Sequence, residues 1–82
     1  MWKRDMNIED VAGLIERFLE DRSLYPQEWN DFIDTPQQDA IANKYRCKCY
    51  ELDPLVNRPG MQDPDAVVRL REIIKSLRTG NV

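Results

Sequence analysis

The sequence predicts an all-α fold, a compact, bundle-like single domain of three to four helices. Apolar residues recur every three or four positions along most of the chain, which is the period of an amphipathic helix. No segment shows the two-residue alternation that is typical of a strand. Proline and turn residues separate the periodic stretches from one another. With 82 residues the chain has the length of one domain with a thin core, so we expect one unit over residues 1–82.

The first helix is expected over residues 8–21. Asn7 is a favourable N-cap residue, and three residues later Asp10 places a carboxylate at the positive end of the helix. Six apolar residues share the side that should face the core: Ile8, Val11, Ala12, Ile15, Phe18 and Leu19. Three acidic residues lie together on the opposite side: Glu9, Glu16 and Glu20.

A short second helix is expected over residues 26–33, as a cross-piece of the bundle. Pro26 stands in its first turn, where proline costs least, and either Ser23 or Tyr25 precedes it. Three large apolar residues fall on one side of this helix: Trp29, Phe32 and Ile33.

The third helix, over residues 36–52, has the clearest predicted start. Thr35 supplies an N-cap, Pro36 takes the first helical position, and a glutamine stands three residues after the cap. Because the residue before a proline avoids helical geometry, Asp53-Pro54 should end this helix. Its main apolar side carries Ile41, Tyr45, Cys49 and Leu52. A second, mildly apolar side carries Ala40, Asn43, Cys47 and Tyr50.

The fourth helix is expected over residues 64–79, after a loop over residues 55–62. Asp63 is its N-cap, Pro64 follows, and Gly80 is a suitable C-cap. The wide apolar side consists of Ala66, Val67, Leu70, Ile73, Ile74 and Leu77. Two residues of the preceding loop should turn into the core: Leu55 and Val56.

The composition argues against catalysis and against metal or cofactor binding. Histidine is absent, and the three glycines are not clustered as in a phosphate-binding loop. Cys47 and Cys49 point about 200° apart on a helix, which rules out a disulfide between them and favours a reduced, cytoplasmic protein. No run of about 18 apolar residues and no signal-peptide segment is present, so we expect no membrane association.

Negative charge is concentrated in the N-terminal part of the chain. Residues 1–34 carry nine acidic and four basic side chains, and residues 35–82 carry six acidic and eight basic ones. We interpret the surface of the first two helices as a docking site for a protein with a basic surface. Its candidate residues are Glu9, Glu16, Glu20, Tyr25, Glu28 and Asp31. The alternative interpretation is an acidic face that interacts only with solvent.

Two further interpretations concern the last two helices. A small nucleic-acid-associated regulator would use the basic stripe Arg71, Lys75 and Arg78, although the acidity of the chain makes nucleic acid a less favourable partner. The same stripe is also explained by the helix end, where cations are stabilised. A homodimer would use Cys47 and Tyr50, which would otherwise pack on the N-terminal segment that carries Trp2.

A third alternative is an accessory enzyme subunit or a carboxylate metal binder. It would use one of two acidic pairs, Glu16 with Glu20 or Asp63 with Asp65. Each pair also has an ordinary structural explanation, as a solvated helix face and as a favourable helix start.

In size, acidity and number of helices the chain is similar to small helical immunity proteins, which neutralise nuclease toxins by covering a basic surface. It lacks the pair of tyrosines of that family, since only Tyr25-Pro26 stands nearby. The similarity implies a bacterial adaptor or inhibitor that binds another protein.

Overall fold

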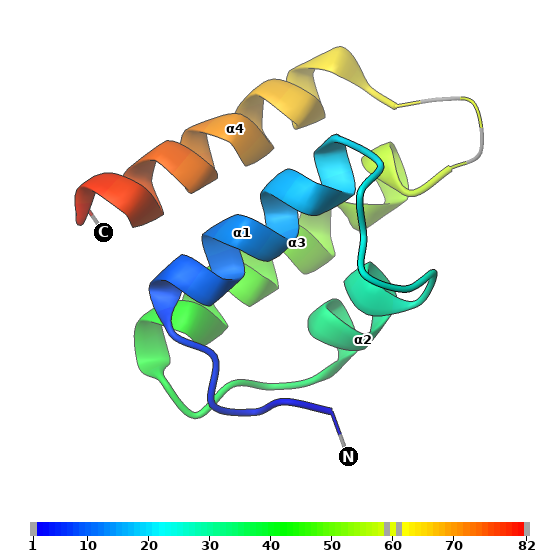
Figure 1. Ribbon diagram of the computed structural model, residues 1–82. Helices are drawn as coiled ribbons and strands as arrows, with labels where there is room; N and C mark the ends of the chain where they lie inside the picture. The colour runs from blue at the N-terminus through cyan, green and yellow to red at the C-terminus, as the bar shows by residue number, and fades with distance from the viewer. Residues whose placement is uncertain (1, 59, 61, 82) are drawn as a thin grey trace.

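The computed structural model describes residues 2–58, 60 and 62–81, and these residues form four helices and no strand. The helices are α1 (Ile8–Leu19), α2 (Glu28–Asp34), α3 (Ala40–Val56) and α4 (Pro64–Thr79), as Figure 1 shows. The all-α prediction is therefore confirmed. The radius of gyration is 11.7 Å, close to the value of about 12 Å expected of a compact chain of this length.

α1 is the central helix and contacts the other three. α4 runs beside it in the opposite direction, and α3 lies behind it (Figure 1). The core side of α1 is sealed from solvent, since Val11, Ala12, Leu14 and Ile15 are at most 1% exposed. Each fully buried large aliphatic side chain contributes about 1.5–3 kcal/mol of favourable transfer free energy. The enclosure of α1 therefore contributes directly to the stability of this thin core.

α1 begins as the sequence predicts and ends two residues earlier. Asn7 and Asp10 form a reciprocal capping box, with N–H···O distances of 2.8 and 3.2 Å. At the other end Asp21 adopts the left-handed backbone conformation, with φ at 56°, and the N–H of Arg22 donates back into the last turn at 2.7 Å. A left-handed residue after a helix ends it in this way, so the predicted range 8–21 is too long.

α2 begins two residues later than the predicted range 26–33. Pro26 lies in the turn before the helix, and the N–H of Glu28 donates to the carbonyl of Tyr25 at 3.1 Å to close that turn. The predicted buried side is confirmed, because Trp29, Phe32 and Ile33 are at most 5% exposed.

The predicted start of the third helix at Pro36 is wrong. Thr35 closes α2 instead, since its Oγ1 donates to the carbonyl of Asp31 at 2.6 Å. Asp39 caps α3, and its carboxylate accepts from the N–H of Ala42 at 2.8 Å. The capping pattern at residues 35–38 is favourable locally, but in the folded chain these residues form hydrogen bonds with other partners.

Gln37 is the physical reason why no helix forms at that point. Its side chain is 7% exposed and joins two distant segments. The Oε1 atom accepts from the N–H of Met6 at 3.0 Å, and Nε2 donates to the carbonyl of Lys3 at 3.0 Å. The next residue along the chain, Gln38, donates its N–H to the carbonyl of Arg4 at 2.8 Å. An extended connection is needed to make these bonds, so the N-terminal segment and the α2–α3 connection hold each other in place.

The predicted end of the third helix before Pro54 is also wrong, because α3 continues to Val56. A proline within a helix removes one backbone hydrogen bond. Two contacts offset that loss: Val56 is buried at 2% exposure, and the indole N–H of Trp29 donates to the carboxylate of Asp53 at 2.7 Å. The tertiary contacts of the last turn therefore outweigh the local preference.

Two residues that were assigned to the core lie at the surface. Ile41 is 40% exposed and Leu55 is 46% exposed. Ile41 falls in the first turn of α3, at the edge of the buried side. Because α3 continues through residue 55, Leu55 takes a helical position outside the buried side, whereas Val56 takes one on it.

α4 has the predicted bounds. The carboxylate of Asp63 accepts from the N–H groups of Asp65 and Ala66 at 2.9 and 3.1 Å, Pro64 follows the cap, and Gly80 is left-handed with φ at 73°. Its buried residues are Ala66, Leu70, Ile73, Ile74 and Leu77.

Truncation of Leu70 tests the core side of α4. Leu70 is 0% exposed, so Leu70→Ala should lower the free energy of unfolding by about 2–5 kcal/mol in urea titrations followed by circular dichroism. Val68 lies on the same helix but is 54% exposed, and Val68→Ala should stay within about 0.5 kcal/mol of the unmodified chain. Equal losses in the two variants would contradict the orientation of α4.

Candidate binding groove

Glu9 and Glu16 of α1 and its C-cap residue Glu20 were expected to form an open acidic surface, but they contact basic side chains of the same chain. Arg78 of α4 binds two of them: its Nε lies 3.3 Å from Glu9, and its Nη1 and Nη2 lie 2.8 and 3.2 Å from the carboxylate oxygens of Glu16. Glu20 lies 3.5 Å from Arg22. Much of the negative charge on this side of α1 is therefore compensated within the molecule.

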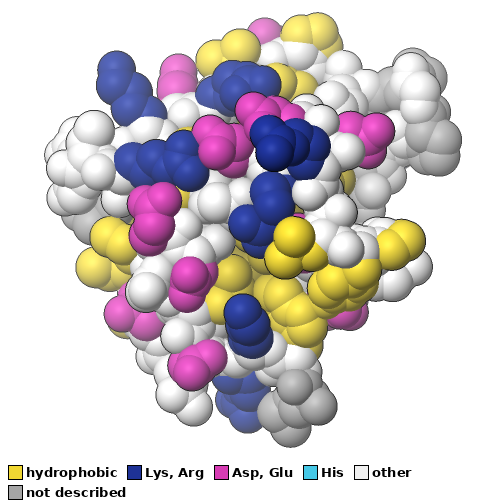
Figure 2. All heavy atoms as spheres, in the orientation of Figure 1, with side chains coloured by type: hydrophobic (Ala, Val, Ile, Leu, Met, Phe, Trp, Pro, Cys, Tyr) yellow, Lys and Arg dark blue, Asp and Glu magenta, His cyan; other side chains and the backbone are white. Residues whose placement is uncertain are grey.

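The contact of Arg78 with Glu9 and Glu16 also removes Arg78 from the predicted basic stripe on α4 as a free positive charge. The hydrogen bonds between Arg78 and Glu16 lower the pKa of the Glu16 carboxyl and raise the pKa of the Arg78 guanidinium. Arg71 and Lys75 are exposed. Figure 2 shows basic and acidic side chains intermixed over α1 and α4. The intermixing leaves no extended surface of one sign on this face.

Glu28, a candidate for the docking surface, is buried at 2% exposure, so its placement at the surface is wrong. The Nε and Nη2 atoms of Arg17 donate to its two carboxylate oxygens at 3.2 and 3.0 Å. The N–H of Leu24 donates to the same carboxylate at 3.3 Å. A buried carboxylate needs such partners, and this pair fixes the α1–α2 connection to both helices.

Tyr25 and Asp31 remain at the surface, where they contact each other. The Tyr25 hydroxyl donates to the Asp31 carboxylate at 2.7 Å. Partial burial, followed by the hydrogen bond to Asp31, raises the pKa of Tyr25 to about 12. The hydroxyl therefore stays protonated at neutral pH and acts as a hydrogen-bond donor.

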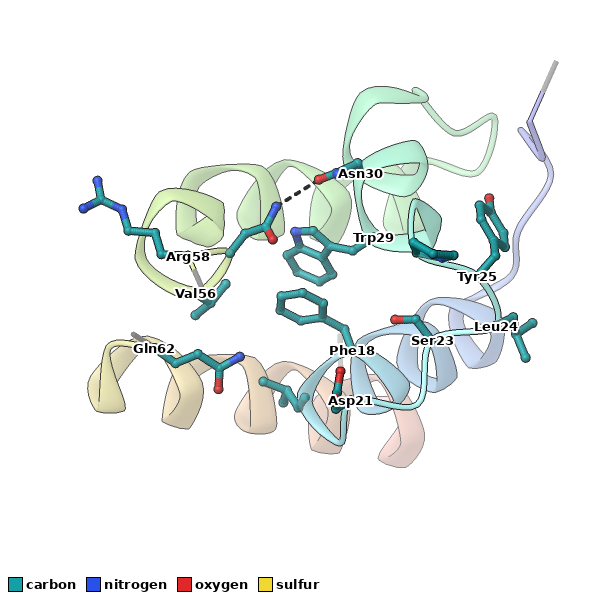
Figure 3. Close-up of a pocket in the computed structure, with 13 residues that line it drawn as sticks. Phe18, Asp21, Ser23, Leu24, Tyr25, Trp29, Asn30, Val56, Arg58 and Gln62 are labelled. Carbon is teal, nitrogen blue, oxygen red and sulfur yellow. Dashed lines mark hydrogen bonds between the residues drawn. The ribbon is translucent and has the colours of Figure 1, made fainter. Parts of the chain in front are cut away.

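A groove of about 700 Å³ lies where the α1–α2 connection meets the C-terminal end of α3 (Figure 3), and we call it the end groove. Its lining comes from the last turn of α1, from the connection Asp21 to Pro26, from the first turn of α2, and from residues 56–58 and 62. Two loops and three helix ends thus form one concave surface.

Two stacked aromatic rings lie in the middle of the end groove. The rings of Phe18 and Trp29 are 4.0 Å apart between centroids and inclined by 16° (Figure 3). Trp29 is 3% exposed and its indole N–H donates to Asp53, so the partly exposed ring of Phe18 supplies the apolar surface that this pair offers to the groove.

Amide side chains form the polar rim of the end groove. Nδ2 of Asn57 donates to Oδ1 of Asn30 at 2.9 Å, and Nδ2 of Asn30 donates to Oε1 of Gln27 at 3.1 Å. Gln62 lies across the groove from this pair (Figure 3). An amide both donates and accepts, as a peptide backbone does, so the rim is chemically suited to peptide groups.

Leu24 stands at the edge of the end groove and is 74% exposed. In Figure 3 its side chain points outward from the connection, next to Tyr25. Figure 2 shows hydrophobic side chains gathered over the connection between α1 and α2. A large apolar side chain beside a concave surface is typical of an interaction site.

The titratable side chains that line the end groove are Asp21, Tyr25 and Arg58. Among the residues that the structure describes, no three cysteine or acidic side chains are grouped as metal ligands. Burial raises the pKa of the Cys49 thiol to about 12, which keeps it protonated, whereas Cys47 is exposed. Within the described part of the chain, no helix combines the length and the apolar character needed to cross a membrane.

Sequence reasoning missed the end groove and the Arg17–Glu28 pair. Both depend on how the connection folds back over α1, which no periodic pattern reports. One signal was available: Leu24-Tyr25-Pro26 places apolar residues in a short turn region that has no need of them.

No protein-family model, curated protein or solved structure matches this chain. The groove, the exposed apolar residues and the charge distribution are therefore the observations from which its function is inferred.

Glu16→Gln tests the contact between α1 and α4 through its pH dependence. Because Arg78 lowers the pKa of Glu16, the folded protein binds this proton less readily than the unfolded chain does. The stabilisation should be complete above the ordinary carboxyl value of 4.5 and should be lost as the pH falls through the lower folded value. Melting temperatures measured from pH 3 to 7 should fall less steeply toward acid in the variant. Parallel curves would contradict the contact.

Replacement of Glu28 tests the buried ion pair. Glu28→Leu should lower the free energy of unfolding by about 2–4 kcal/mol, because it removes the partner of Arg17 and of a backbone N–H. Glu20→Leu is the matched control, since Glu20 is exposed, and it should change stability by less than about 0.5 kcal/mol. Urea titration measures both values.

Proposed function

We propose that the protein is a protein-binding module and that the end groove accepts an extended segment of its partner. The segment carries an apolar side chain next to a basic one. The observation that carries this proposal is Leu24, a leucine 74% exposed at the edge of a groove whose middle is the stacked Phe18–Trp29 pair. Exposed apolar residues beside a concave apolar surface favour association.

The apolar part of the segment fits the size and lining of the groove. A volume of about 700 Å³ lies within the range of roughly 300–1,000 Å³ that is typical of ligand sites. An aliphatic or aromatic side chain of the partner would pack on the accessible part of the Phe18 ring, and the segment would contact Leu24 at the edge. Burial of a rigid aromatic surface contributes affinity at little cost in side-chain entropy.

The polar rim supports an extended backbone in the bound segment. Asn57 and Gln62 lie on opposite sides of the groove, and each amide can both donate and accept. The Asn30–Asn57 hydrogen bond holds one side in position before binding. Such preorganisation lowers the entropic cost of association.

The basic part of the segment follows from charge. The α1–α2 part of the chain has an excess of acidic residues, and Asp21 lies exposed on the edge of the groove. Arg58 lies on the other side, so a basic side chain is directed toward Asp21 and away from Arg58 (Figure 3). Charge therefore favours a basic partner, which the groove, rather than Glu9 and Glu16, would recognise.

Leu24→Ser tests this function. The tagged chain captures its partner from the native host, mass spectrometry identifies it, and calorimetry measures the affinity of the purified pair. Leu24→Ser should weaken binding about tenfold or more, because the apolar contact at the edge is lost. Asp21→Asn keeps a residue that tolerates the left-handed backbone and should weaken binding mainly at low salt.

Val68→Ser is the matched control, since Val68 is also exposed but lies on α4, outside the groove. It should bind as the unmodified chain does. Addition of partner should also shift the NMR signal of the Trp29 indole N–H. Equal affinities of the Leu24 and Val68 variants, with an unmoved Trp29 signal, would contradict the proposal.

A further inference from the structure

We propose that the outward face of α3 pairs with the same face of a second copy of this chain, in antiparallel orientation about a two-fold axis near Cys47. The outward face of α3 consists of Ala40, Lys44, Cys47, Tyr50, Glu51 and Pro54, all exposed. It lies outside the end groove and is independent of the proposed partner segment.

The face is opposite the buried side of α3. The buried residues of this helix are Ala42, Tyr45, Cys49, Leu52 and Val56. At about 100° per residue, Cys47 points away from the centre of that set. Tyr50 is 58% exposed, whereas tyrosine side chains in folded proteins are more often partly buried.

The alternative cover for Tyr50 was the N-terminal segment, and the structure places that segment elsewhere. Trp2 lies in a hollow with Met6, Leu24 and Tyr25, between the N-terminal segment and the α1–α2 connection. Tyr50 does not line that hollow. The N-terminal segment therefore does not supply the cover for Tyr50.

The shape of the face permits two helices to approach closely. Ala40, Cys47 and Pro54 recur at intervals of seven residues and form a narrow line along the helix. None of the three projects a long side chain. A line of this kind can pack along another helix with its larger residues on the flanks.

The charges on the flanks select the partner and its direction. Lys44 and Glu51 lie on one flank, about equally far from Cys47 on either side of it. An antiparallel copy places Lys44 opposite Glu51 of the second copy, and the two-fold axis repeats that pair. A parallel copy would place Lys44 and Glu51 opposite the uncharged flank of the other copy, so that this ion pair would not form.

The second flank is also self-complementary. Asn43 and Tyr50 are related by the same axis, so the amide of one copy lies opposite the hydroxyl of the other. The Arg46 guanidinium lies beside this face, because it donates to the carbonyl of Ile33 at 2.6 Å and to the Sγ of Cys47 at 3.4 Å. Lys44 lies over the Tyr45 ring at 5.4 Å, from which its flexible side chain can reach the flank.

The area sets the expected strength. One pair of helices of this length buries less than the roughly 1,200 Å² of a standard interface, so the dimer should be weak. We expect a dissociation constant in the range of about 10 µM to 1 mM. Self-association of this strength depends on local protein concentration.

Charge exchange across the axis is the decisive experiment. Sedimentation equilibrium of the unmodified chain should show a monomer–dimer equilibrium. Lys44→Glu and Glu51→Lys should each weaken it at least about tenfold, because each places like charges opposite each other twice. An equal mixture of the two variants should dimerise again. The Lys44→Glu chain is negative at positions 44 and 51 and the Glu51→Lys chain is positive at both, so each facing pair is then oppositely charged. Lys75→Glu, on α4, should behave as the unmodified chain.

A thiol cross-link tests the position of the axis. A short bismaleimide should join two copies through Cys47, and Cys47→Ser should prevent this, because Cys49 is buried. Circular dichroism confirms that each variant is folded. The proposal is overturned if the unmodified chain stays monomeric up to about 1 mM. It is equally overturned if the mixture of charge variants fails to recover association.

Discussion

Enclosing α1 on several sides is the constraint on which the rest of this structure depends. A chain of 82 residues has little apolar surface to bury, and it places α1 against α2, α3 and α4 together. Val11, Ala12, Leu14 and Ile15 are consequently removed from water almost completely. With neighbours so close, the polar residues at the margins of α1 also meet partners, as Glu16 does with Arg78 and Arg17 with Glu28.

The enclosure of α1 decides which surfaces remain for recognition. Several of the carboxylates that give the sequence its acidic character form ion pairs within the bundle. A continuous negatively charged surface therefore does not form on α1. Exposed apolar groups lie at the end of the bundle and on the outer side of α3, and Val68 is exposed on α4. Leu24 and Tyr50 are the most exposed of them near each surface. Association through these groups would remove further apolar surface from water.

Specific side-chain hydrogen bonds position the connecting segments. Gln37 joins the N-terminal segment to the α2–α3 connection, and Asn57 joins the end of α3 to α2 through Asn30. The bond from Trp29 to Asp53 performs the same task between α2 and α3. Each is worth only about 1 kcal/mol net, yet leaving a buried partner unsatisfied would cost more. The shape of the end groove therefore depends on a few polar contacts as well as on burial.

The sequence by itself determined the class of fold, the bounds of α4 and most of the core. Those features follow from short-range physics: the period of apolar residues, the cap at Asn7 or Asp63, and the left-handed glycine at Gly80. Only the tertiary structure decided where α3 begins and ends, because Gln37 and Asp53 bind residues far away in the chain. It also decided that Glu28 is buried and that Phe18 and Trp29 stack, since both depend on the path of a connection between helices. Periodicity reports which side of a helix is apolar, but it carries no information about which distant side chain will meet it.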